Sequence, residues 1–219
     1  MRARAMDDDE GVPPLLLALI GAMTAIELLL SAADRGLLGA TDWRQIALIH
    51  GAFWQPVMDG TARPAFSGQA ITMFASYAFL HGGLLHLAMN AVILLSLGKF
   101  VAQRAGQWAM LLLFLVSAVA GGLTFGLLSR GAGPMIGASG AVFGFLGLWQ
   151  YWEAATRRRL RASLQPVLAT IGTLIAINVA MAVFMGGALA WQAHLGGFLA
   201  GVALGPLMTG FARRRAMRR

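Results

Sequence analysis

A serine and a histidine far apart in the chain are the first residues that could perform chemistry together. Ser139 stands in GASGAVFG, residues 137–144, where small residues flank a lone hydroxyl near the start of an apolar stretch. His194 stands in WQAHLGGFLAG, at the start of another. A serine needs a nearby base to become a nucleophile, and histidine has an ordinary pKa suited to that work near neutral pH. The two residues are therefore a candidate nucleophile and base.

A third stretch, HGGLLHLAMN, adds polar residues to an apolar background: His81, His86 and Asn90. His86 and Asn90 are four positions apart, which places them on the same face of a helix. Histidine and asparagine are costly in hydrocarbon unless they face protein or water, so this group of residues is a candidate functional site. Each residue also has an ordinary alternative, because a membrane serine commonly bonds its own helix and a lone buried histidine commonly serves packing.

The composition shows which elements must position these side chains. Of the 219 residues, 58% are hydrophobic and only 12% are charged, which indicates a membrane protein rather than a soluble domain. The apolar residues form continuous runs instead of the alternation of β-barrel strands, so we predict an all-α membrane protein, a bundle of six transmembrane helices. The predicted spans cover residues 14–33, 79–98, 108–128, 135–152, 164–183 and 191–211.

The predicted organisation is one membrane domain with short tails. We expect a cytosolic tail over residues 1–13, the six-span domain over 14–211, and a basic cytosolic tail over 212–219. The segment between the first two spans, about 34–77, mixes apolar, aromatic and sparse charged residues. This composition leaves open a structured piece in the outer interface or an ordinary packed loop.

The basic residues predict the orientation. Most of them share one side of the membrane: Arg2, Arg4, Lys99, Arg104, Arg157, Arg158, Arg159, Arg161, Arg213, Arg214, Arg215, Arg218 and Arg219. The other side receives only Arg35, Arg44, Arg63 and Arg130. Because positive residues favour the cytosolic side, both termini are predicted to lie in the cytosol. The basic clusters lack an interleaved aromatic platform, so nucleic acid is not an expected partner.

Successive spans cross the membrane in opposite directions, so every second span enters from the same face. The polar candidate residues therefore lie at a similar depth in the membrane. The second, fourth and sixth spans all enter from the outer face, and His86, Ser139 and His194 lie early in those three spans. Polar side chains in hydrocarbon are costly unless they face protein or water. Their gathering predicts a cavity that opens outward.

These motifs resemble those of the rhomboid intramembrane serine proteases. The family's GxSG motif appears as GASG at 137–140, its AH motif as Ala193–His194, and its HxxxN motif as HLAMN from His86 to Asn90. The resemblance covers about 79–205. The N-terminal third fits only in having one span and a long outer segment, and the family's acidic ExxxG residue is missing from VAQRAG at 101–106.

The resemblance implies a role for each candidate. Ser139 would be the nucleophile and His194 the base in a catalytic dyad, while His86, Asn90 and the Ser139 backbone N–H would stabilise the oxyanion. Phe143 occupies the position where the family commonly stacks an aromatic ring on the histidine. The expected function is endoproteolysis of single-span or polytopic membrane proteins, in or near the outer part of their spans, within a lipid bilayer and without a cofactor or metal.

Small residues indicate how two of the spans approach each other. Gly197, Gly201 and Gly205 form a GxxxGxxxG stripe, which allows the sixth span to pack closely on a neighbour. The predicted neighbour is the fourth span, with Gly137, Gly140, Gly144 and Gly147. Glu27 in the first span is either a functional acid or a partner in an interhelical contact.

Other functions remain open at this point. A noncatalytic rhomboid-like protein that binds membrane helices is one alternative, and a small transporter with His81, His86 and Asn90 in its path is another. A zinc intramembrane protease is disfavoured because the chain has no HExxH motif. The predicted location is the bacterial plasma membrane.

Overall fold

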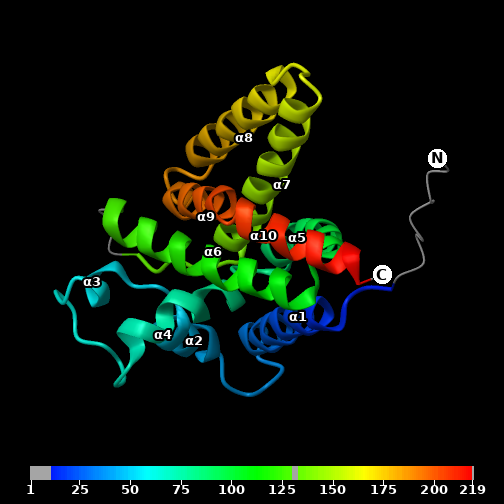
Figure 1. Cartoon of the computed structure of the whole chain (residues 1–219). Coiled ribbons are helices and arrows are strands. Elements are labelled where there is room, and N and C mark those ends of the chain that lie inside the picture. The colour runs from blue at the N-terminus through cyan, green and yellow to red at the C-terminus, as the bar shows by residue number, and fades with distance from the viewer. Residues whose placement is uncertain (1–10, 130–132, 219) are drawn as a thin grey trace.

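The computed structural model describes residues 11–129 and 133–218. Arg2, Arg4, Arg130 and Arg219, which count toward the predicted orientation, lie outside this part. The described chain is almost wholly helical (Figure 1). Its elements are α1 (Pro14–Asp34), α2 (Trp43–Gly51), α3 (Gln55–Met58), α4 (Gln69–Ser76), the 3-10 helix η1 (Tyr77–Phe79), α5 (Leu84–Ala105), α6 (Gln107–Leu128), α7 (Ser139–Arg159), α8 (Gln165–Phe184), α9 (Trp191–Ala203) and α10 (Gly205–Met217).

Each apolar stretch predicted to span the membrane contains a helix, but two begin later than expected. The second span begins at Leu84 because η1 and Gly83 precede it, and the φ of +121° at Gly83 breaks the helix. The fourth begins at Ser139 rather than at residue 135. Four helices, α1, α5, α6 and α8, are each long and apolar enough to cross a membrane, and the α9–α10 pair raises this to five. The six-span count therefore stays a prediction.

The sixth predicted span is bent. It consists of α9 and α10, whose axes differ by 49° across a short break. Pro206 explains the bend, since it has no backbone N–H with which to continue the helix. Helix α10 continues to Met217, past the predicted end of the span at residue 211.

Glycines bring α7 and α9 into backbone contact. A Cβ on Gly197 would overlap the carbonyl oxygen of Gly140, and a Cβ on Gly201 would overlap that of Gly144. A Cβ on Gly147 would likewise overlap the Phe198 carbonyl oxygen. The predicted pairing of the fourth and sixth spans is thus confirmed. In Figure 1, α6 lies alongside α9, and α8 stands beside α7 on the side away from α1.

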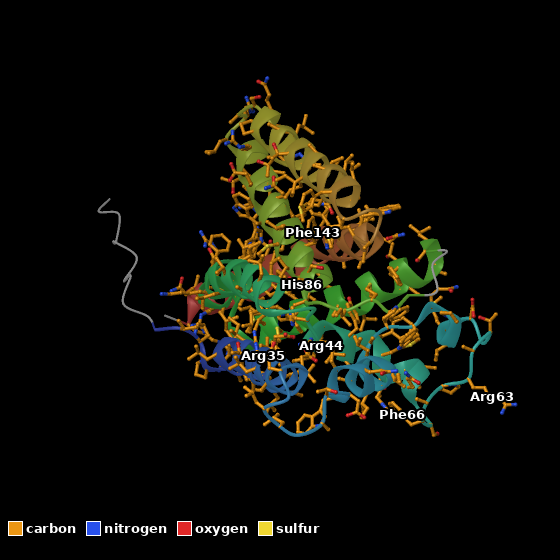
Figure 2. All side chains as sticks on the ribbon, turned by 180° about the vertical axis from the view of Figure 1, so that it is seen from behind. Arg35, Arg44, Arg63, Phe66, His86 and Phe143 are labelled. Carbon is orange, nitrogen blue, oxygen red and sulfur yellow. The ribbon has the colours of Figure 1, made fainter. Side chains whose placement is uncertain are left out.

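The segment between α1 and α5 is structured. Helices α2, α3 and α4 occupy it, and in Figure 1 α2 and α4 lie together beside α1 while α3 lies farther out. The indole N–H of Trp54 donates to the Leu48 carbonyl at 2.8 Å, and Gln69 Nε2 donates to the Ile49 carbonyl at 2.6 Å. Of the two readings of this segment, the structured one is confirmed. Arg63 lies at the tip of its outlying loop (Figure 2).

The beginning of α1, the turn between α5 and α6, and α10 lie together at one end of the bundle. The Leu15 N–H donates to Gln107 Oε1 at 3.4 Å, and Arg215 Nε donates to the Gln103 carbonyl at 3.3 Å. The first and last described helices thus meet at the same end. This agrees with the prediction that both termini share a side, whereas the identity of that side stays a prediction.

Candidate active site

Ser139 is the first residue of α7, and an irregular segment leads into it. Residues 133–138 are not helical, and Met135 pairs with Phe53 through two backbone hydrogen bonds of 3.0 and 2.9 Å. The Gly137 N–H donates to the Tyr77 carbonyl at 3.0 Å. Phe53, from the segment between α1 and α5, and Tyr77 of η1 therefore fix the backbone that leads to Ser139.

The serine and the histidine meet across the α7–α9 contact. His194 Nε2 lies 2.8 Å from Ser139 Oγ, a hydrogen-bond distance. His194 is only 8% exposed, and the ring of Phe143 stacks on its imidazole with centroids 4.2 Å apart and planes 3° apart. Ser139 Oγ is therefore within hydrogen-bond reach of the imidazole.

The other imidazole nitrogen has a partner that sequence reasoning missed. His194 Nδ1 lies 2.5 Å from Oδ1 of Asn178, in the middle of α8. The sequence analysis assigned no role to this residue. A signal existed, because an asparagine inside an apolar span is costly unless another group pairs with it.

The candidate oxyanion residues lie at the start of α5, next to the serine loop. A Cβ on Gly137 would stand 2.7 Å from Cε1 and 2.8 Å from Nε2 of His86, so the ring lies against this glycine. His86 Nδ1 accepts a hydrogen bond from the Gly82 N–H at 3.3 Å. Asn90 is buried and donates from Nδ2 to the His86 carbonyl at 2.9 Å. An amide carries two N–H hydrogens, so Asn90 has a second donor to offer.

His81 contacts both His86 and the backbone just before Ser139. Its ring packs edge-on against that of His86, with centroids 5.1 Å apart. The Ala138 N–H donates to His81 Nε2 at 3.4 Å. His81 thus braces both the residue before the serine and the histidine on α5. Seen from behind, His86 and Phe143 lie toward the centre of the molecule (Figure 2).

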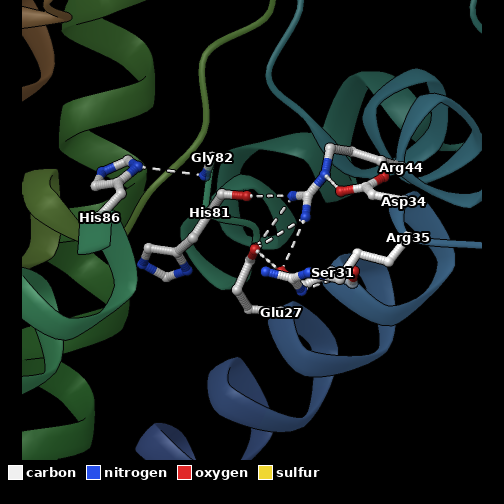
Figure 3. A network of polar contacts seen from close by, with 8 residues as sticks. All are labelled: Glu27, Ser31, Asp34, Arg35, Arg44, His81, Gly82 and His86. Atoms are coloured by element: carbon white, nitrogen blue, oxygen red, sulfur yellow. Dashed lines mark hydrogen bonds and ion pairs between the residues drawn. The ribbon is translucent and has the colours of Figure 1, made fainter. Parts of the chain in front are cut away.

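Glu27 takes part in a buried ion pair. Its carboxylate is fully buried and receives both terminal nitrogens of Arg44 on α2, at 2.9 and 3.1 Å. Arg44 also bonds Asp34 at 2.6 Å and donates to the His81 carbonyl at 2.8 Å (Figure 3). The hydrogen bond with Glu27 raises the pKa of Arg44 above its ordinary value. Of the two readings of Glu27, the interhelical contact is the one observed.

An apolar cavity of about 620 Å³ adjoins the histidine. It lies between α8 and the α7–α9 pair, and its lining includes Phe143, Ile175 and Phe198. His194 and Asn178 are polar residues among those that line it. Among the described residues, no group of three His, Cys, Asp or Glu side chains could hold a metal ion.

Comparison with known proteins identifies the family. The chain is 36% identical over 127 residues to RHOMBOID-like protein 1 of Arabidopsis thaliana, covering 58% of this chain and 32% of that protein. It is 32% identical over 141 residues to Rhomboid-like protease 3 of Toxoplasma gondii, covering 64% and 53%. It is 34% identical over 143 residues to Rhomboid protease GluP of Bacillus subtilis, covering 62% and 26%.

These matches span about a quarter to a half of the relatives' own lengths. The model of the Rhomboid domain matches residues 68–211, from just before α4 into α10. The matched region contains Ser139, His194, His86 and Asn90. The chain is therefore an integral membrane protein that belongs to the Rhomboid family.

Proposed function

We propose that this protein is an intramembrane serine endopeptidase with Ser139 as nucleophile and His194 as base. The observation that carries the proposal is the 2.8 Å contact between Ser139 Oγ and His194 Nε2. Relatives named as proteases support the same activity. The ring stacked on His194 and the partner on Nδ1 hold the imidazole in the orientation that this reaction requires.

The proposed reaction has two halves. His194 Nε2 takes the Ser139 proton as Oγ attacks the carbonyl carbon of the substrate, and the resulting imidazolium protonates the leaving amine. A water then attacks the acyl-enzyme by the same route, which releases the carboxyl product and restores the serine. Both steps pass through a tetrahedral oxyanion. Its donors would be the Ser139 N–H, free at the first turn of α7, and side-chain N–H groups of His86 and Asn90.

The proposed substrates are single-span or polytopic membrane proteins. Ser139 and His194 stand at the beginnings of α7 and α9. With the predicted orientation, both lie toward the outer face, so the cut should fall in or near the outer part of the substrate's span. The substrate must unwind locally, because unpaired backbone groups in lipid are costly. The cavity beside His194 can receive apolar side chains of the unwound segment.

The proposed setting is the bacterial plasma membrane with both termini in the cytosol. In this arrangement residues 14–211 form the membrane domain, and the outer segment, residues 34–77, lies at the outer interface. The segments 1–13 and 212–219 would be cytosolic. The arginines near the ends of α7 and α10 would then face the anionic inner leaflet.

The test is cleavage of a defined substrate by the purified protein. A single-span protein is reconstituted with the full chain in liposomes, and mass spectrometry locates the cut. We expect cleavage in the outer half of the span, next to a small residue, and none with Ser139→Ala. Binding of the substrate without cleavage by the unaltered protein would favour the noncatalytic alternative. A cut in the cytosolic half would contradict the orientation.

A further inference from the structure

Helix α8 contacts the rest of the bundle along one narrow stripe. Its side chains that are at least partly buried include Val167, Ile171, Leu174, Asn178 and Met181, at helical spacings of three and four residues. The rest of the helix is almost wholly exposed, since only 6% of its apolar window is buried. Asn178 is the polar member of this largely apolar contact stripe.

The hydrogen bonds of α8 distinguish Asn178 from its other polar side chains. Thr170 and Thr173 donate to carbonyls of their own helix, at 3.0 Å each. Within the described residues, Asn178 is the side chain of α8 that hydrogen-bonds another helix. Its contact is with the imidazole of His194 rather than with a backbone group.

The bonds of Asn178 determine the tautomer of the imidazole. Asn178 Nδ2 donates to the Leu174 carbonyl at 2.8 Å, so Oδ1 is the atom that faces His194. An amide oxygen only accepts, and therefore Nδ1 must carry the ring proton. In the neutral ring Nε2 is then the acceptor, as required to receive the Ser139 proton.

We propose that Asn178 is a positioning residue that fixes His194 in the Nδ1–H tautomer and aims Nε2 at Ser139. The inference rests on the proposed function, because it assigns the third member of the hydrogen-bonded chain Asn178–His194–Ser139. The neutral amide takes the place that a carboxylate holds in a serine protease triad. A neutral amide oxygen stabilises the imidazolium less than a carboxylate does, but it accepts from the same Nδ1–H and so selects the same tautomer.

The same contact couples the position of α8 to the chemistry. Helix α8 forms one wall of the cavity beside His194 and has little other support from the bundle. Any movement that takes Asn178 out of hydrogen-bond reach frees Nδ1 and allows the ring to change tautomer. The base is then fully prepared only while Asn178 of α8 stays within hydrogen-bond reach of His194.

The first test observes the tautomer of His194 directly and does not depend on whether the protein cleaves a substrate. The full chain, labelled with ¹⁵N-histidine in detergent, is compared as unaltered protein, Asn178→Leu, Asn178→Asp and Thr173→Val, with His194→Gln used to assign the His194 signals. Asn178→Leu keeps the shape of the side chain and removes the acceptor. Asn178→Asp keeps an acceptor oxygen, and Thr173→Val removes a polar group of α8 that does not touch the imidazole.

We expect protonated Nδ1 and unprotonated Nε2 in the unaltered protein and in Thr173→Val. Asn178→Leu should show a mixture of tautomers, and Asn178→Asp should restore the Nδ1–H form or the imidazolium. Unchanged ring signals in Asn178→Leu would overturn the proposal, whether or not the protein proves to be a protease.

Kinetics on the reconstituted substrate give the second readout. We expect Asn178→Leu to lower kcat at least about tenfold with little change in KM, because orientation of the base acts on the chemical step. Asn178→Asp should recover much of this loss. If the unaltered protein cleaves and Asn178→Leu has the same kcat, the positioning role fails while the proposed function stands.

Discussion

Gly197 of α9 packs directly on the Gly140 carbonyl of α7, at a distance that leaves no room for a Cβ. Ser139 immediately precedes Gly140, and His194 lies one turn before Gly197. This backbone contact therefore sets the distance between the serine and the imidazole. The glycine stripe thus positions the candidate catalytic pair as well as packing the two helices.

Gly197→Ala should weaken activity through this contact. The added methyl must push α9 from α7, and a shift of about 1 Å in a reacting group can cost a hundredfold in rate. We expect a loss of that order in kcat on the reconstituted substrate. Gly172→Ala is the matched control, because a Cβ there meets no atom within 4 Å. Equal activity of the two variants would show that the contact does not position the pair.

The Arg44–Glu27 pair should matter for stability far more than the Arg44–Asp34 pair. Arg44→Ala leaves the fully buried Glu27 without its counter-charge, which costs about 3 to 5 kcal/mol in comparable buried pairs. Asp34→Asn removes only a partner that is 39% exposed, and such contacts contribute about 0 to 1 kcal/mol.

Unfolding in a denaturing detergent measures both variants. The double variant Glu27→Met, Arg44→Met should be more stable than Arg44→Ala, since it leaves no buried charge behind. If Arg44→Ala and Asp34→Asn unfold alike, the buried pair contributes no more to stability than the exposed one.

His86 and Asn90 should act on the transition state. Both residues carry side-chain N–H groups on α5, and the His86 ring lies against Gly137 just before Ser139. Loss of one oxyanion donor lowers turnover by roughly a hundred- to a thousandfold in other serine hydrolases. We expect His86→Ala and Asn90→Ala to lower kcat by roughly ten- to a thousandfold while the protein stays folded. Thermal unfolding provides the folding control. Normal turnover in both variants would leave these residues a purely structural role.

Residue spacing predicts much of the fold and of the candidate site, and its failures have physical reasons. Ser139, His194, His86 and Asn90 are visible because polar residues in apolar helices stand out. The same reasoning could have found Asn178, but no spacing in the sequence relates α8 to His194. Only the tertiary packing brings the two together. The bend after Ala203 was also missed, although Pro206 gives a local signal for it.

The outer segment was less predictable than the membrane helices. Its helices α2, α3 and α4 are short, and their positions depend on long-range contacts such as Gln69 with the Ile49 carbonyl and Arg44 with Glu27. Short helices carry little intrinsic stability, so tertiary contacts rather than local pattern decide them. Composition alone could not choose between an ordered segment and a loop.

The orientation is tested by reporter fusions at two sites. A fusion after the C-terminus and one in the loop between α7 and α8 should both report the cytosol, because arginines are concentrated at both positions. A fusion in the loop between α3 and α4 should report the outer side. An outer signal at either of the first two positions would place Ser139 near the cytosolic face instead.

The central claim is that His194 activates Ser139, and covalent labelling tests it most directly. The purified protein is treated with a serine-reactive fluorophosphonate, and mass spectrometry identifies the modified residue. We expect a single adduct on Ser139, whose formation is lost in Ser139→Ala and nearly lost in His194→Ala, with both variants folded. Undiminished labelling in Ser139→Ala, or unchanged labelling of Ser139 in His194→Ala, would contradict it.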